Sequence, residues 1–143
     1  MIVRHEDAGP ITNANLGQYD SDDDGDINFS SNSGTLIVFS NNTLYVWGGR
    51  IYTPGGNILT PILKVVGTMD AGSNTIAVTG SGTPVVFTGT FNPGTSTFQY
   101  YATSATNIAA GNYYNLSFVP AGSATYTLGT AASQTIRTDG TFL

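Results

Sequence analysis

The residues best suited to chemistry in this chain are the aspartates between positions 20 and 26, in the segment Asp-Ser-Asp-Asp-Asp-Gly-Asp. Asp20, Asp22 and Asp24 stand at positions one, three and five of the spacing with which a calcium loop brings hard oxygen ligands together. Asp26 would contribute its backbone carbonyl, and Gly25 would take the sharp turn. We therefore predict a calcium site on Asp20, Asp22, Asp24 and Asp26.

The acidic segment departs from an EF-hand in two ways. Position twelve of the loop is Ser31, where an EF-hand has a bidentate Glu. The remaining ligand would have to come from Asn28, Asp23 or Asp7, and no flanking helices are predicted. The alternative to a calcium site is a solvated acidic turn ahead of the first strand.

The other ionisable residues do not form a recognisable catalytic set. His5 is the only histidine, and the chain has no cysteine, so a catalytic triad or a zinc site lacks its components. His5 is expected to lie in a solvated tail. Glycosidases need paired carboxyl groups, whereas the charged residues after position 26 stand singly: Arg50, Lys64, Asp70, Arg137 and Asp139. We predict a protein that is not an enzyme.

Aromatic residues offer a second kind of site. Tyrosine and tryptophan combine a large apolar ring with a polar group, and an exposed strip of them could bind a glycan. The alternative is that they stack inside or along the fold. In each Tyr-Tyr pair of a strand, one ring must lie on each face. The residues concerned are Tyr45, Trp47, Tyr52, Tyr100, Tyr101, Tyr113 and Tyr114.

Composition narrows the classes of partner. Only 9% of the residues are charged, against about 25% in an ordinary domain. Seven of the nine acidic residues lie within positions 1–26. No basic patch could neutralise phosphates, so a nucleic-acid partner is not expected. No apolar run is long enough to span a membrane, and no signal peptide is visible.

From Ile27 onward the chain alternates short strand-like runs with Gly, Pro, Asn and Ser. The runs have the usual length of a strand, several alternate with period two, and no window has an apolar stripe at helical spacing. The predicted strands are residues 34–39, 43–47, 50–53, 62–66, 75–79, 84–88, 96–101, 113–118, 125–128 and 134–137.

A recurring block decides between two all-β architectures. Gly72-Ser-Asn-Thr-Ile76 returns as Gly94-Thr-Ser-Thr-Phe98 and as Gly122-Ser-Ala-Thr-Tyr126. Such recurrence is typical of stacked coils that place the same turn at the same corner. We predict a parallel β-helix over residues 32–143, with residues 1–31 as an N-terminal arm and acidic cap. An antiparallel sandwich or jelly roll is the alternative.

Three segments resemble a repeat of large bacterial cell-surface, adhesin-like proteins. They match the motifs GTFxPGTSTxxF, YYNLxF and TYTL at residues 89–98, 110–118 and 125–129, and residues 140–143 resemble the opening of another unit. The resemblance covers residues 67–143, and residues 43–56 resemble the segment that precedes such repeats. It implies a parallel β-helix in a cell-surface stalk and supplies no ligand.

These patterns together favour a non-enzymatic structural protein. We expect an extracellular stalk, spacer or filament subunit of a cell surface, with an adhesive role. The alternatives are a phage decoration or fibre protein at the virion surface, and a carbohydrate-binding module that uses exposed tyrosines. Self-association is expected, either head-to-tail or as a trimer, because the ends of a solenoid expose unpaired backbone groups.

Overall fold

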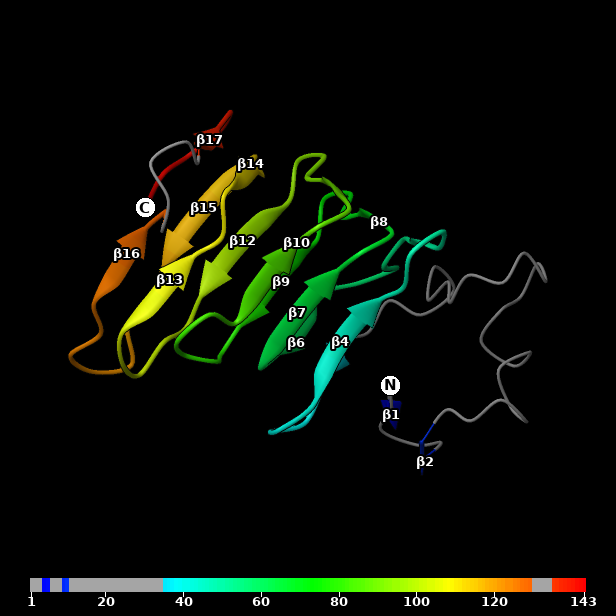
Figure 1. Cartoon of the computed structure of the whole chain (residues 1–143), viewed down its shortest axis with the longest axis horizontal. Helices are drawn as coiled ribbons and strands as arrows, with labels where there is room; N and C mark the ends of the chain where they lie inside the picture. Colours follow the sequence, from blue (N-terminus) through cyan, green and yellow to red (C-terminus); the bar gives the residue numbers. More distant parts are fainter. Residues whose placement is uncertain (1–3, 6–8, 11–34, 130–134) are drawn as a thin grey trace.

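The computed structural model shows a β-solenoid. It describes residues 4–5, 9–10, 35–129 and 135–143, and these ranges contain strands and turns but no helix. A short antiparallel pair, β1 (Arg4–His5) with β2 (Gly9–Pro10), precedes the solenoid. All other paired strands run parallel (Figure 1), which confirms the parallel β-helix and excludes the antiparallel sandwich.

Each coil of the solenoid has three strands, one on each side. The strands of the first two coils are β3 (Leu36–Ile37), β4 (Thr43–Val46), β5 (Ile51–Tyr52), β6 (Ile58–Thr60), β7 (Ile62–Val65) and β8 (Thr68–Asp70). Those of the next three coils are β9 (Thr75–Val78), β10 (Val85–Phe87), β11 (Thr90–Asn92), β12 (Thr97–Tyr100), β13 (Thr106–Ile108), β14 (Gly111–Tyr113), β15 (Asn115–Phe118), β16 (Tyr126–Leu128) and β17 (Ile136–Thr138).

The first side of the solenoid is a continuous five-stranded sheet. Its order is β15-β12-β9-β6-β3, and we call it the first sheet. Ile58 pairs with Ile76 in the next coil, and Ile76 pairs with Phe98 in the coil after that. Because every strand adds one rung in register, side chains of the same face lie directly above one another.

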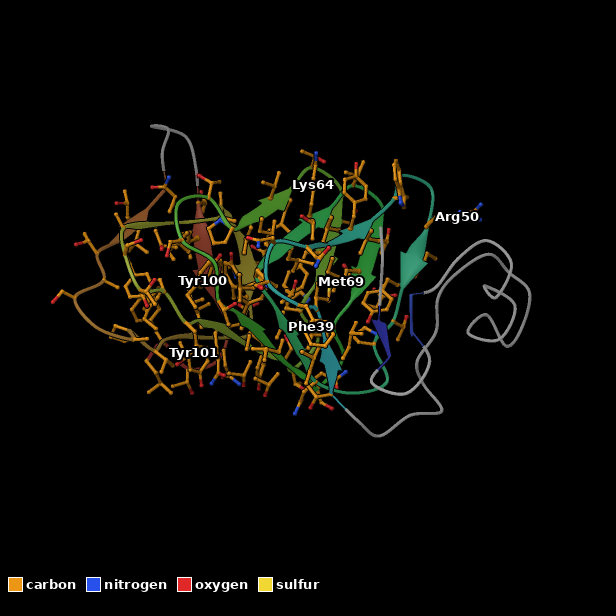
Figure 2. All side chains as sticks on the ribbon, turned by 90° about the horizontal axis from the view of Figure 1, so that it is seen from below. Phe39, Arg50, Lys64, Met69, Tyr100 and Tyr101 are labelled. Atoms are coloured by element: carbon orange, nitrogen blue, oxygen red, sulfur yellow. The ribbon has the colours of Figure 1, made fainter. Side chains whose placement is uncertain are left out.

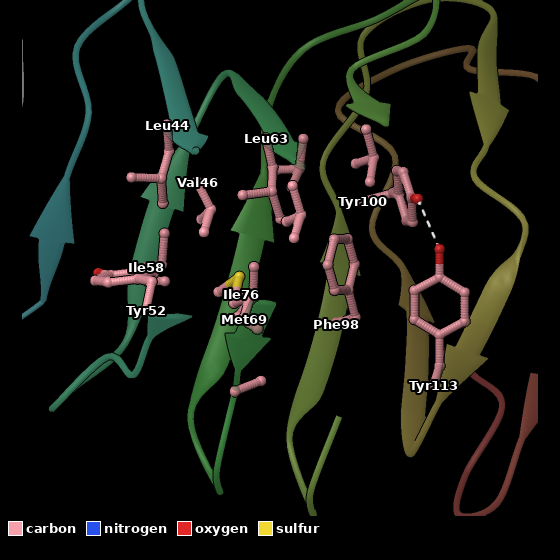
Figure 3. Packing of buried hydrophobic residues seen from close by; sticks show 14 of the residues in the cluster. Leu44, Val46, Tyr52, Ile58, Leu63, Met69, Ile76, Phe98, Tyr100 and Tyr113 are labelled. Atoms are coloured by element: carbon pink, nitrogen blue, oxygen red, sulfur yellow. Dashed lines mark hydrogen bonds between the residues drawn. The ribbon is translucent and has the colours of Figure 1, made fainter. Parts of the chain in front are cut away.

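The interior consists of apolar rows that run through the coils. One row of the first sheet is Ile58, Ile76, Phe98 and Leu116, each exposed by 1% or less. The opposite side contributes Leu44, Leu63 and Val85, which are also stacked in register. Figure 3 shows buried side chains from both sides converging between the sheets. In strands such as β4 and β12, the period-two alternation therefore buries one face of the strand.

Polar side chains form a row at the N-terminal ends of the strands in the first sheet, on its outer face. The Asn57 Oδ1 atom accepts a hydrogen bond from the Thr75 amide at 2.8 Å, and Asn115 Oδ1 accepts one from the Thr141 amide at 2.8 Å. Asn115 Nδ2 also donates to Thr97 Oγ1 at 3.3 Å. These side chains join successive coils beyond the backbone ladder, as expected for a stack of Asn and Thr.

The other two sides are interrupted between the third and fourth coils. Their sheets end at β10 and β11 and resume as the pairs β13-β16 and β14-β17, with one bridge between Gly82 and Thr106 at the break. Aromatic rings fill this level of the core. The Phe87 and Phe91 rings stack with centroids 4.7 Å apart, and Phe98 contacts both at right angles.

The third copy of the repeated block lies on a different side from the first two. The Thr95 amide donates to the Gly72 carbonyl at 2.8 Å, so Gly72 and Gly94 share a corner as predicted. The prediction was wrong for Gly122. The strand that stacks on β12 is β15, whereas Tyr126 of the third block pairs with Thr106 of β13. The same turn sequence occurs at two different corners of the three-sided coil. It therefore cannot by itself determine which strands pair.

Candidate functional site

The predicted calcium ligands Asp20, Asp22, Asp24 and Asp26 lie outside the described residues, as do Asp23, Asn28 and Ser31. The calcium site remains a prediction. In the described part of the chain, no three His, Cys, Asp or Glu side chains gather in a group that could hold a metal ion. There, Asp70 Oδ1 accepts a hydrogen bond from Asn92 Nδ2 at 2.6 Å, and Asp139 pairs with Arg137 at 2.7 Å.

The predicted aromatic strip is divided between the core and the surface. Tyr100 and Tyr113 are fully buried and Tyr52 is 6% exposed, so none of these three rings can stack on a glycan. Tyr101 and Tyr114 are partly exposed. The expectation that each Tyr-Tyr pair splits between inside and outside is confirmed, and Figure 2 shows Tyr100 within the molecule and Tyr101 at its lower edge.

The buried residues Tyr100 and Tyr113 form a closed hydrogen-bond network with the Ala109 backbone. The Tyr113 hydroxyl donates to the Ala109 carbonyl at 2.8 Å, and the Ala109 amide donates to the Tyr100 hydroxyl at 3.2 Å. The two hydroxyl oxygens lie 3.2 Å apart (Figure 3). Since the Tyr113 proton is engaged with Ala109, Tyr100 is the donor between them. Both hydroxyls in this apolar core are thereby satisfied.

Burial of these tyrosines predicts loss of stability at alkaline pH. Desolvation raises the pKa of Tyr100 to about 12, and it also raises the pKa values of Tyr113 and Tyr52 above their usual 10. The folded chain therefore holds these protons more tightly than the unfolded chain. Their stabilisation is complete well below pH 10 and is lost as the pH rises through the folded-state pKa of Tyr100, about 12.

The measurement for this pH effect is a paired experiment. Urea unfolding at pH 8, 10 and 11 should show a falling free energy of unfolding. Absorbance at 295 nm should show that three of the eight tyrosines ionise late, together with unfolding. Ionisation of all eight near pH 10 in the folded state would contradict the burial described here.

Two other aromatic residues of the predicted strip, Tyr45 and Trp47, form a cluster at the surface with Lys64. Tyr45 in β4 and Trp47, just after its end, have ring centroids 4.5 Å apart and planes inclined by 45°. The Lys64 Nζ atom lies 5.2 Å from the Tyr45 ring centroid. We call Tyr45, Trp47 and Lys64 the aromatic–lysine patch. Trp47 is 60% exposed.

The sequence indicates the two aromatic residues of this patch but not its cation. Lys64 of β7 pairs with Tyr45 of β4 in the preceding coil. No recurring motif links these two positions, so only the register of the coils brings the two side chains together. The sequence predicts Lys64 as an isolated charge, and the structure places it over an aromatic ring.

The comparisons with known proteins add no further site. No protein-family model, no curated protein and no solved structure matches this chain. Among the residues that the structure describes, no helix has the length and apolar character needed to cross a membrane.

Proposed function

We propose that this chain is a non-enzymatic structural protein that serves as a stalk, spacer or filament subunit at the outer surface of a cell. The observation that carries the proposal is the unbroken register of the first sheet through five coils. At about 4.8 Å per coil, each coil forms the base of the next, and the stack has the character of a rod. A rod of this kind can act as a spacer between other domains or proteins, or it can connect them. In the second case it would contribute to adhesion.

The last coil supports head-to-tail association. The Leu116 amide donates to Thr141 O, and the Leu143 amide donates to Leu116 O, both at 2.9 Å. The N–H and C=O groups of Phe142 therefore point away from β15. Phe142 is 56% exposed and Leu143 is 71% exposed. A strand edge beside exposed apolar side chains is suited to pairing with a further coil, and we propose that a second copy of this chain provides it.

The alternative is a virion decoration or fibre protein that closes into a trimer. It is favoured by the outer face of the first sheet, which carries no charged side chain within the described residues. Its central row is Ile37, Leu59, Ala77, Gln99 and Ser117. Phe39, 53% exposed, lies next to this row along the chain. An uncharged face of this kind suits packing against copies of itself.

One experiment separates these two assemblies. Light scattering and electron microscopy of the purified chain should show mass that grows with concentration and open rods. Phe142→Asp should abolish that growth, whereas Phe39→Asp should leave it intact. A closed trimer that is lost with Phe39→Asp and kept with Phe142→Asp would favour the virion alternative. A monomer at every concentration would contradict self-association of either kind.

We also propose that Asp20, Asp22, Asp24 and Asp26 bind calcium and stabilise the N-terminal end. A ligand present at 100 times its Kd stabilises the folded state by about 2.7 kcal/mol. Removal of calcium with EDTA should therefore lower the Tm by several degrees, as followed by circular dichroism. The double variant Asp20→Asn, Asp22→Asn is the control and should be insensitive to EDTA. A wild-type Tm unchanged by EDTA would disprove the site.

A further inference from the structure

The aromatic–lysine patch has the features of a ligand-binding surface. Tyr45 and Trp47 are alternate residues along one extended segment, so both rings lie on the outer face of the solenoid. The inclined rings present two apolar surfaces close together. Trp47 is the only tryptophan in the chain and the most exposed of the large aromatic side chains in the described residues. An exposed tryptophan of this kind is a common anchor for a partner.

Among the described residues, the charged side chain beside these rings is the cation Lys64. Lys64 extends over Tyr45, and the Arg50 amide donates to the Trp47 carbonyl at 3.1 Å, so Arg50 follows directly from the turn after Trp47. In the described part of the chain, the one ion pair joins Arg137 and Asp139. Lys64 and Arg50 thus have no carboxylate partner there. Figure 2 shows Lys64 at the upper edge and Arg50 towards the N-terminal end.

We propose that the aromatic–lysine patch binds an acidic polysaccharide, with a uronate residue as the recognised unit. The apolar C–H face of the sugar ring packs on the exposed Trp47 ring, with the Tyr45 ring beside it. The uronate carboxylate accepts a charge-assisted hydrogen bond from Lys64. The inference is independent of the structural role proposed above.

The same residues could stack on the bases of a nucleic acid, but the charge balance argues against it. The chain carries a net charge of −5, and Lys64 is the one cation of the patch. Nucleic-acid binding rests on the neutralisation of several closely spaced phosphates. A single lysine does not provide that neutralisation, whereas one cation is enough to pair with the carboxylate of one uronate.

Trp47 fluorescence provides a direct measurement at the site. Tetragalacturonate added to the full chain at low salt should change the Trp47 emission with a saturable curve and a Kd on the order of 1 mM. A neutral galactose tetrasaccharide should bind several-fold more weakly. Sodium chloride at about 0.5 M should remove most of that difference, because salt screens the exposed charges.

Matched variants locate the charge contribution. Lys64→Gln should weaken tetragalacturonate binding about fivefold and leave the neutral tetrasaccharide unaffected. Arg137→Gln removes a cation at the far end of the solenoid and should change neither affinity. Circular dichroism confirms that each variant is folded.

Three results would overturn the proposal. They are a Trp47 emission that does not respond to tetragalacturonate at concentrations well above the expected Kd, equal affinity for the acidic and neutral sugars, and tighter binding of an oligothymidylate of the same length. None of these results bears on self-association, which is measured by light scattering.

Discussion

Replacement of Phe98 by alanine should cost about 3–5 kcal/mol of the free energy of unfolding. Phe98 is 1% exposed and lies at the centre of the aromatic layer between the third and fourth coils. Its ring contacts Phe87, Phe91 and Tyr113, with centroids 5.2 to 6.2 Å away. The strand ladder on two sides of the solenoid is interrupted at this level, so packing of the rings connects the coils. The cavity left by the Phe98 ring would therefore be strongly destabilising.

Urea unfolding followed by circular dichroism measures the effect of Phe98→Ala. Phe39→Ala is the matched control, because Phe39 is 53% exposed and its truncation should change the free energy of unfolding by no more than about 0.5 kcal/mol. Equal effects of the two variants would mean that the aromatic layer does not support the stack.

The second large effect is expected at Gly89, although this residue is exposed. A Cβ atom at Gly89 would overlap the carbonyl oxygens of Val66 and Gly67 in the coil below. A Cβ atom at Gly67 would likewise overlap the carbonyl oxygens of Trp47 and Arg50. The obstructing atoms belong to backbone and cannot rotate away, so Gly89→Ala should cost about 3 kcal/mol through forced separation of the coils.

Gly48→Ala is the control for this glycine column. Gly48 lies at the equivalent turn of the first coil, and the nearest atom to its added Cβ would be Val66 Cγ1 at 3.5 Å, an ordinary contact. The change should be neutral or slightly stabilising, because alanine reduces the entropy of the unfolded chain. Thermal melts of both variants measure the difference. A Gly89→Ala protein as stable as Gly48→Ala would show that the coils are not in close contact at this corner.

Several strands can be predicted from local pattern and several cannot. The predicted strands at residues 43–47, 75–79 and 96–101 correspond to β4, β9 and β12. The missed strands of the solenoid are β6, β8, β11, β13 and β14, and the pair β1-β2 ahead of it was also not predicted. Three of these belong to one side of the coil and consist of segments such as Thr-Met-Asp and Gly-Asn-Tyr. Such segments contain residues of low strand propensity, and they are held extended by the ladder to neighbouring coils.

The surface patch illustrates the same limit. Tyr45 and Trp47 are two residues apart in an extended segment, so they lie on the same face of it in any strand. This part of the patch can be predicted from the sequence. The approach of Lys64 to Tyr45 depends on the length of one particular coil, and this length varies along the solenoid, as the pairs Ile58–Ile76 and Ile76–Phe98 show. The coils differ in length because the loops at their corners differ in length. The local sequence carries little information about the length of each corner.

The sequence by itself determined the class of fold: short alternating strands, frequent turn residues and a recurrent corner leave a stacked parallel coil as the consistent solution. Only the tertiary structure decided which residues stack on which. Parallel pairing joins segments a full coil apart in the sequence, and its register depends on the packing of buried rings and on glycines that allow backbones to touch. Those contacts are non-local, so neither the aromatic layer at Phe98 nor the patch at Trp47 and Lys64 is visible in any single stretch of the chain.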